Sequence, residues 1–164
     1  MLIPAYTLGG FYFLGKAMTT IAYHHKDKQI AFDSRSSRDN VIMSDDIFKS
    51  KTVNDIVFII CGSACDETLF IDMFFGAESK IIPNCDAYAV DKGITYRCGI
   101  DDGVLWKHAL EHNDSLGSGW MSAISAMDFG LSAEESVKYA MKRDCFTGGK
   151  VNVYDITSKS FLKI

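Results

Sequence analysis

The sequence predicts a single α+β domain in which sheet layers are covered by helices. Most of the chain consists of short β-type runs separated by Gly, Asp and Asn, and these runs are interrupted by helical periodicity in the order strands, helix, strands, two helices, strands. With 164 residues, 48% of them hydrophobic, only two prolines and no low-complexity tract, the chain can bury a proper core without an internal linker. Groups of strands alternating with helices at this length favour packed sheets with helices outside.

The first half begins with strand patterns. Residues 19–25 (TTIAYHH) and 28–34 (KQIAFDS), joined by Lys26-Asp27, predict a hairpin. Residues 41–44 (VIMS) and 55–62 (DIVFIICG) predict two more short strands, the second apolar enough for a buried position. Their succession predicts a meander. Residues 65–77 then change to helical spacing, with apolar side chains at i and i+4 and Gly76 as the stop.

The second half returns to strands and ends with a strand pair. Residues 86–90, 94–100 and 104–112 have β character, and the Asp-Lys-Gly and Asp-Asp-Gly segments between them are typical of tight hairpins. A helix is expected from Gly117-Ser118-Gly119-Trp120 to Gly130, and Ser132 with Glu135 predicts a capping box that begins a helix through about Arg143. Residues 151–156 and 160–164 predict the final pair.

Composition restricts the partners and the compartment. A net charge of −4 without a basic run argues against nucleic acid as a partner. Five cysteines, an odd number with no CxxC pair, suggest neither a disulfide framework nor a zinc site, so a reducing cytoplasm is expected. We expect no metal and no cofactor, since no third ligand accompanies His108 and His112 and no phosphate-binding Gly-rich loop is present.

The first residues are expected to be separate from the domain. Residues 1–17 are apolar and aromatic, but the run is shorter than the ~20 residues that span a bilayer and has no basic segment before it, so neither a membrane anchor nor a signal peptide is expected. Residues 1–18 are instead interpreted as a leader, a propeptide or the product of an upstream translation start. The single domain then covers residues 19–164.

The segment from Met18 to Lys49 carries the chemistry of an N-terminal nucleophile. A threonine hydroxyl is a poor nucleophile unless a base takes its proton, and if Thr19 is the first residue of the mature chain its own α-amine is that base. An α-amine titrates near ~7.7–8.0, so part of it is neutral at physiological pH. A lysine beside the hydroxyl would stabilise negative charge, and an aspartate would hold the lysine. Asp33 and Lys49 are the candidates.

Each of these residues also has a structural interpretation. Thr19 is an ordinary strand residue unless it becomes the N-terminus. Asp33 is equally explained as a turn residue bonded to nearby backbone N–H groups. Lys49, in the segment Asp-Asp-Ile-Phe-Lys-Ser-Lys, is also explained as a solvated charge, and Lys51 is an equal candidate on the sequence alone.

Further motifs complete a resemblance to a known family. They are Met-Thr-Thr-Ile at 18–21, Asp33-Ser34-Arg35, the Gly-Ser-Ala turn at Gly62, Gly117-Ser118-Gly119, and Arg143-Asp144 followed by Thr147-Gly148. In order and spacing they resemble the proteasome β subunits and their bacterial relative HslV, the peptidase of a two-component ATP-dependent protease. The resemblance covers nearly everything from Thr19 to Ile156.

The resemblance implies a four-layer αββα sandwich of the N-terminal nucleophile hydrolases and a threonine endopeptidase acting on unfolded polypeptide. It also implies a homo-oligomeric ring fed by an ATP-dependent unfoldase. The implied site residues are the nucleophile Thr19, its electrostatic support Asp33 and Lys49, the oxyanion glycine Gly62, the amine-positioning residues Ser118, Asp144 and Thr147, the substrate-backbone contact Ser37, and the pocket residue Ile60.

The chain departs from the family at three points. Met18 stands where many members carry the glycine at which they cut themselves, and Thr147 replaces the usual serine. The link from Gly76 to Asp86 is too short for the second long helix of the family, which is expected to be reduced or absent. Ser118 is also explained as a helix N-cap, Gly62 as a turn, Asp144 as an ion-pair partner and Thr147 as a loop hydroxyl.

Two other functions remain open on the sequence. One is a catalytically silent assembly or scaffold subunit, which is favoured if the residues before Thr19 stay attached. The other is a small-amide hydrolase of the same fold, which would need a closed pocket in place of an open groove at a strand edge.

Overall fold

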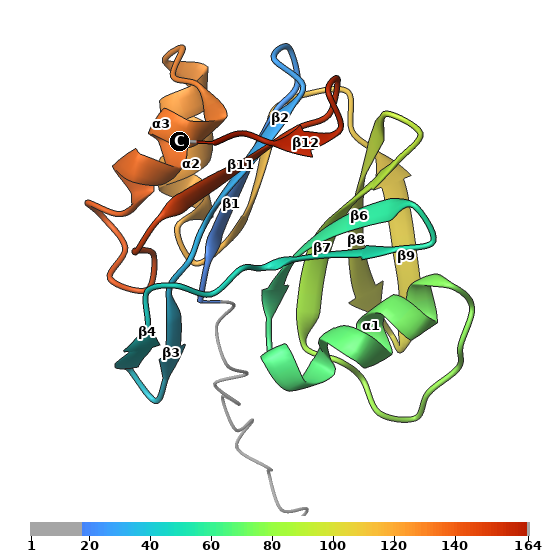
Figure 1. The fold of residues 1–164 in the computed structure, drawn as a ribbon. Coiled ribbons are helices and arrows are strands. Elements are labelled where there is room, and N and C mark those ends of the chain that lie inside the picture. The colour runs from blue at the N-terminus through green and yellow to red at the C-terminus, as the bar shows by residue number, and fades with distance from the viewer. Residues whose placement is uncertain (1–17, 164) are drawn as a thin grey trace, which may run out of the picture.

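The computed structural model describes residues 18–163. Apart from Met18, the expected leader over residues 1–18 therefore lies outside the described residues. The described chain forms two five-stranded sheets, one two-stranded hairpin and three α-helices (Figure 1). All strand pairs are antiparallel, so the predicted α+β class is confirmed.

The first sheet carries the N-terminal hairpin at its centre, in the order β10-β1-β2-β11-β12. Strand β1 (Thr20–His24) pairs with β2 (Gln29–Asp33), which confirms the predicted hairpin. Strand β10 (Asp114–Gly117) lies on the outer side of β1, while β11 (Val151–Asp155) lies beside β2 and is followed by β12 (Ser160–Phe161). Gly117 is opposite Thr20, and Val151 is opposite Asp33. The ends of four strands that are distant in sequence therefore meet at one end of this sheet.

The second sheet is a meander in chain order. It consists of β5 (Ser50–Val53), β6 (Ile56–Gly62), β7 (Cys85–Asp91), β8 (Ile94–Asp101) and β9 (Val104–Ala109). The turn after β7 has Lys92 and Gly93 at positive φ, the backbone that a tight hairpin requires. The predicted hairpins at residues 91–93 and 101–103 are therefore confirmed.

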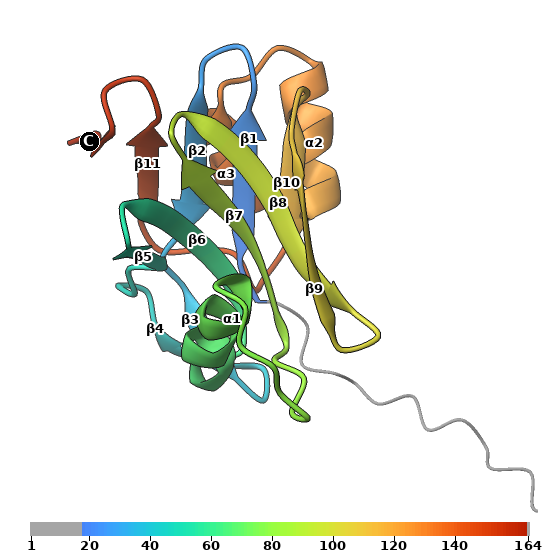
Figure 2. The same ribbon diagram turned by 90° about the vertical axis from the view of Figure 1, so that its right-hand side faces the viewer.

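Alternation along the strands divides the core into three clusters. One cluster lies between the two sheets, of which the second is in front of the first in Figure 2. It includes Ile21 and Phe32 from the first sheet with Ile59 and Tyr88 from the second. The outer face of the second sheet packs against α1 (Glu67–Phe74), which follows a short 3₁₀ turn (Ala64–Asp66). The outer face of the first sheet packs against α2 (Trp120–Asp128) and α3 (Ala133–Ala140).

The predicted meander of residues 41–44 with 55–62 is wrong. Strand β4 (Val41–Ser44) pairs with β3 (Ser36–Arg38) as a separate exposed hairpin, and β6 lies between β5 and β7. The β-type side chains of VIMS predicted a strand correctly, but they gave no information about its partner. The pairing depends on the path of the chain after Lys49. Strand β5 begins at the next residue and belongs to the second sheet, so it takes the position beside β6.

Other boundaries also differ from the prediction. Residues 114–117 form β10 because they complete the edge of the first sheet, so the helix expected from Gly117 begins only at Trp120. The helix expected to reach Arg143 ends at Ala140, although its predicted capping box, Ser132 with Glu135, is present. Residues 75–84, all of them described, contain no helix. Within residues 18–163, no helix has the length and apolar character needed to cross a membrane.

Candidate active site at Thr19

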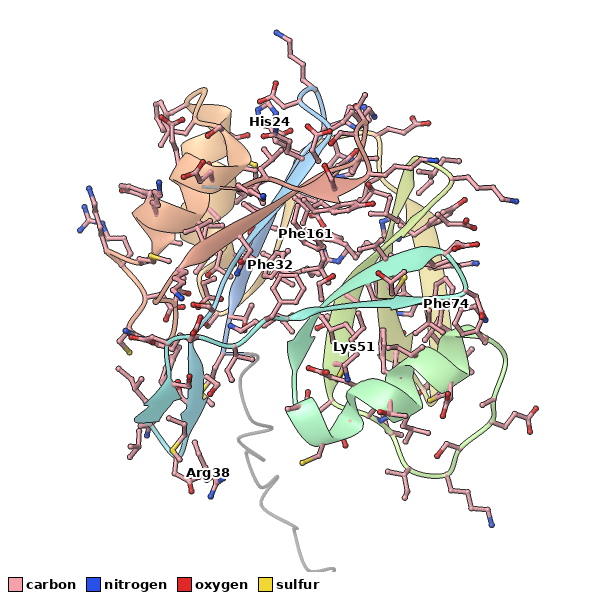
Figure 3. All side chains as sticks on the ribbon, in the orientation of Figure 1. His24, Phe32, Arg38, Lys51, Phe74 and Phe161 are labelled. Carbon is pink, nitrogen blue, oxygen red and sulfur yellow. The ribbon has the colours of Figure 1, made fainter. Side chains whose placement is uncertain are left out.

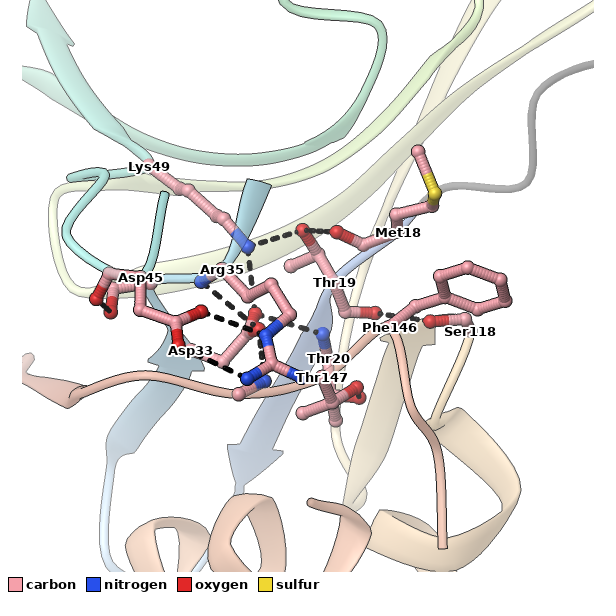
Figure 4. Close-up of polar contacts among 12 residues, drawn as sticks. Met18, Thr19, Thr20, Asp33, Arg35, Asp45, Lys49, Ser118, Phe146 and Thr147 are labelled. Carbon is pink, nitrogen blue, oxygen red and sulfur yellow. Dashed lines mark hydrogen bonds and ion pairs between the residues drawn. The ribbon is translucent and has the colours of Figure 1, made fainter. Parts of the chain in front are cut away.

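Thr19 lies directly before β1 and is 3% exposed (Figure 4). Its hydroxyl oxygen accepts a hydrogen bond of 2.6 Å from Lys49 Nζ. The hydroxyl itself donates to the carbonyl oxygen of Met18 over 2.5 Å. Since a hydroxyl has one hydrogen, the Thr19 proton points at Met18 as long as that residue is attached. The nucleophile candidate is therefore in contact with the lysine that the sequence analysis assigned to it.

Lys49 and Asp33 form a buried ion pair beneath Thr19. Lys49 Nζ lies 2.8 Å from Asp33 Oδ1, and the two side chains are 7% and 0% exposed. Lys51, the alternative lysine, instead forms an ion pair of 2.7 Å with Glu67 on the side of α1, where its side chain is 45% exposed (Figure 3). The structure thus places Lys49, and not Lys51, at the hydroxyl of Thr19.

Burial dominates the electrostatics of this pair. It lowers the pKa of Lys49, and the attraction of Asp33 opposes that shift. Burial also raises the pKa of Asp33, against the opposing effects of Lys49 and of backbone donors. Those donors are the N–H groups of Thr20 (3.2 Å), Gly148 (2.9 Å) and Arg35 (3.3 Å). Asp33 is therefore both the turn residue of its structural interpretation and the partner of Lys49.

A second polar cluster holds the backbone of Thr19 from the other side. Ser118 N donates to the Thr19 carbonyl over 2.8 Å. Ser118 Oγ donates to Asp144 Oδ2 over 2.5 Å, and Thr147 Oγ1 donates to the same carboxylate oxygen over 2.6 Å. The structure thus brings together the three residues expected to position the amine. Ser118 is not the N-cap of α2, because Gly119 occupies that position.

Two glycines allow this close approach. Gly117 has a φ of +90°, and a Cβ there would lie 1.8 Å from the Thr19 carbonyl oxygen. A Cβ at Gly119 would lie 2.2 Å from Thr20 Oγ1. A larger residue at position 117 would separate β10 from the backbone of Thr19. A larger residue at position 119 would displace the side chains of Thr20 and Thr147. The first glycine of the Gly-Ser-Gly motif is therefore required by a backbone contact and the second by side-chain packing.

The remaining predicted residues lie on separate elements. Gly62 ends β6 with a φ of +124°, and the preceding Ile60 donates its N–H to the Lys49 carbonyl over 3.1 Å. The Ile60 side chain is 2% exposed and packs in the cluster beneath α1, so it does not line an open surface. Ser37 lies on β3 with its hydroxyl buried and without a partner among the described residues. Their roles toward a substrate stay predictions.

The sequence analysis missed the role of Arg35. Its guanidinium binds Asp45 through two hydrogen bonds of 2.7 and 3.1 Å and donates to the Cys145 carbonyl over 2.9 Å. This pairing lowers the pKa of Asp45. A Cβ at Gly148 would lie 2.3 Å from the centre of the guanidinium. Arg35 thus joins three segments around Asp33, and only the Asp-Ser-Arg motif pointed to it.

Comparisons with known proteins give likeness of fold. The chain matches no protein-family model and no curated protein. It is similar to the solved structure of Thiobacillus denitrificans BPH in complex with epoxomicin, with a TM-score of 0.64 and 17% identity over 82% of this chain and 96% of that one. A second structure of Thiobacillus denitrificans BPH matches with a TM-score of 0.61 and 16% identity over 83% and 95% of the two chains. At this identity, the likeness shows a shared fold.

Proposed function

We propose that this chain is a threonine endopeptidase of the N-terminal nucleophile class, related to the proteasome β subunits and HslV. The contact that carries the proposal is the one from Lys49 Nζ to Thr19 Oγ1 at 2.6 Å, with Asp33 Oδ1 2.8 Å from the same nitrogen. A buried lysine that donates to a threonine hydroxyl directly before a strand places a positive charge where the oxygen would become negative during attack. The succession of helix, sheet, sheet and helix supports assignment to the αββα sandwich of this class.

The mechanism requires a free Thr19 amine. While Met18 is attached, the Thr19 nitrogen is an amide and cannot act as a base, and the hydroxyl hydrogen is bound to the Met18 carbonyl. Removal of Met18 would release this hydrogen and create an amine in the same step.

In the mature chain, Thr19 Oγ attacks the carbonyl carbon of a peptide bond while its proton passes to the α-amine. The Lys49 ammonium stabilises the negative charge that develops at Oγ, and the Gly62 N–H is the proposed donor to the carbonyl oxygen. The C–N bond then breaks, the ammonium returns the proton to the leaving nitrogen, and an ester with Thr19 remains. Water hydrolyses this ester with the same amine as base.

Assembly into a ring is part of the proposal, because an open peptidase of low specificity would endanger its cell. Large apolar side chains at the two ends of α2 support it. Trp120, Met121 and Phe129 are 48%, 64% and 89% exposed. Large apolar side chains grouped on one exposed helix are typical of a contact with another protein. We propose a cytoplasmic homo-oligomer that receives unfolded polypeptide from an ATP-dependent unfoldase. The free thiols of all five cysteines are consistent with a reducing compartment.

The test combines intact mass with peptide hydrolysis. We expect the protein purified from its native cell to begin at Thr19 and to cleave fluorogenic peptides. Thr19→Ala should abolish peptide cleavage, since the nucleophilic hydroxyl is removed even when the α-amine is free. Thr19→Ser should retain activity, because it keeps the hydroxyl and the amine.

The controls separate this function from its rivals. A native chain that still begins before Thr19 would support the silent scaffold subunit, since its proposed base would not exist. Hydrolysis of small amides without cleavage of peptides would support the small-amide hydrolase. Phe129→Asp should lower the mass measured by light scattering if α2 lies in a contact between copies, whereas an unchanged mass would remove that surface from the proposed assembly.

A further inference from the structure

A second threonine, Thr20, lies wholly buried beside the candidate nucleophile. It is 0% exposed, and its N–H donates to Asp33 Oδ1 over 3.2 Å. Its hydroxyl lies 2.6 Å from Thr147 Oγ1 and faces Gly119, where a Cβ would come within 2.2 Å. The absence of a side chain at Gly119 leaves the space that the Thr20 hydroxyl occupies beside Thr147. None of the roles proposed above for the site uses this hydroxyl.

The direction of the hydrogen bonds around Asp144 is determined by counting hydrogens. An ionised carboxylate only accepts, and each hydroxyl has one hydrogen to donate. Thr147 gives its hydrogen to Asp144 Oδ2 over 2.6 Å, so at the contact of 2.6 Å between the two threonine hydroxyls Thr20 must be the donor. The bonds therefore run in one direction from Thr20 through Thr147 to Asp144.

The same count of hydrogens shows which group accepts the hydrogen of the Ser118 hydroxyl. Its hydrogen is bound to Asp144 Oδ2 at 2.5 Å, and the longer separation of 3.4 Å from its Oγ to the Thr19 carbonyl is then a contact without a hydrogen. Ser118 Oγ consequently offers only lone pairs to any further group. Ser118 is one of the residues that the family resemblance assigns to the Thr19 amine. An ammonium donor there would be stabilised by such an acceptor, whereas a neutral amine would gain less.

We propose that Thr20 is a positioning residue for the Thr19 amine, acting through a relay in which Thr20 donates to Thr147 and Thr147 donates to Asp144, the carboxylate that also accepts from Ser118. The relay rests on the proposed function, because it assumes a free amine at Thr19. Consecutive hydrogen bonds polarise one another, so the Thr20 donor strengthens and orients the bond from Thr147 to Asp144. That bond in turn keeps the carboxylate oxygen in place for Ser118.

The variant that tests the relay is Thr20→Val, which keeps the shape of the side chain and removes the donor. In chains beginning at Thr19, we expect kcat to fall about tenfold, with KM within about twofold of the wild type, since orientation of the base and not substrate binding is lost. The acid limb of the kcat/KM profile should move to lower pH, because a less well-held Ser118 stabilises the ammonium less. Thr20→Ser should restore both.

Thr95→Val is the matched control. Thr95 is also a buried threonine, 2% exposed, but its hydroxyl has no partner among the described residues and lies outside the site. Its variant should behave as the wild type. If Thr20→Val does not fold, Thr147→Val interrupts the same relay one bond further on and must produce the same shift of the acid limb. An unchanged acid limb in the folded variant would overturn the relay.

A measurement of the amine itself separates the relay from the peptidase. The rate at which acetic anhydride acetylates the Thr19 amine, read by mass of the N-terminal peptide across a pH series, reports its titration without any catalysis. A lower amine pKa in Thr20→Val, in a protein that cleaves no peptide, would support the relay and refute the function. An active wild type with the same amine titration in Thr20→Val would support the function and refute the relay.

Discussion

Replacement of Lys49 by methionine is the sharpest test of the buried ion pair. Methionine fills most of the volume of the lysine stem, so the variant removes a charge without leaving a large cavity. Breaking a buried pair from one side typically costs about 3–5 kcal/mol, because the remaining charge stays buried without its partner. Asp33 keeps three backbone donors, those of Thr20, Arg35 and Gly148. We therefore expect the low end, about 3 kcal/mol in the free energy of unfolding.

The assay is urea unfolding of wild type, Lys49→Met and Lys51→Met in parallel. The pair of Lys51 with Glu67 is substantially exposed, so its loss should cost less than about 1 kcal/mol. Peptide hydrolysis should fail in Lys49→Met and persist in Lys51→Met. In Lys49→Met/Asp33→Asn the buried charge is gone, and much of the stability should return while activity stays lost. Equal costs for the two lysine variants would refute the reasoning.

The pH dependence provides a further check on the sign. Burial raises the pKa of Asp33, and loss of Lys49 removes the charge that opposes this shift. Below its raised pKa, the native variant binds a proton that the unfolded chain does not bind until about pH 3.9. Stability lost to the buried carboxylate at pH 7 should therefore be regained as the pH falls through the raised pKa of Asp33. A difference from the wild type that stays constant over this range would contradict a charged Asp33 as its cause.

Two further predictions concern backbone geometry and helix capping. Gly62→Ala should lower the free energy of unfolding by about 2–3 kcal/mol, since its φ is +124° and the new Cβ would lie 2.1 Å from the Asn84 carbonyl oxygen. Gly93→Ala is the control, because its φ of +80° carries similar strain but nothing lies within 4 Å of the Cβ, and thermal melts of the two variants should differ clearly. Ser132→Ala should cost about 1 kcal/mol in urea unfolding through loss of the capping box, with peptide hydrolysis unchanged; a cost near zero would mean that α3 begins without help from this cap.

Local chemistry in the sequence determined much of the fold. The alternation in residues 19–34, the Asp-Gly turns at 91–93 and 101–103, and the capping box at Ser132 each define an element through neighbouring residues alone. These features predicted hairpins and helices at the observed places. The motif residues Thr19, Asp33 and Lys49 were also found from their order in the chain, by resemblance to a family whose site has the same spacing.

Only the tertiary structure decided which distant segments meet. The strand at 41–44 was predicted, but its pairing with Ser36–Arg38 was not, because side-chain pattern defines a strand without defining its partner. The choice of Lys49 over Lys51 likewise depended on where the chain enters the second sheet. The hydroxyls of Thr20 and Thr147 are in contact although the two residues are 127 positions apart in sequence. The contact depends on the pairing of β1 with β10 and on Gly117 and Gly119, which no local pattern relates to Thr147. Contacts of this kind arise from packing over the whole chain, so they become visible only in the folded protein.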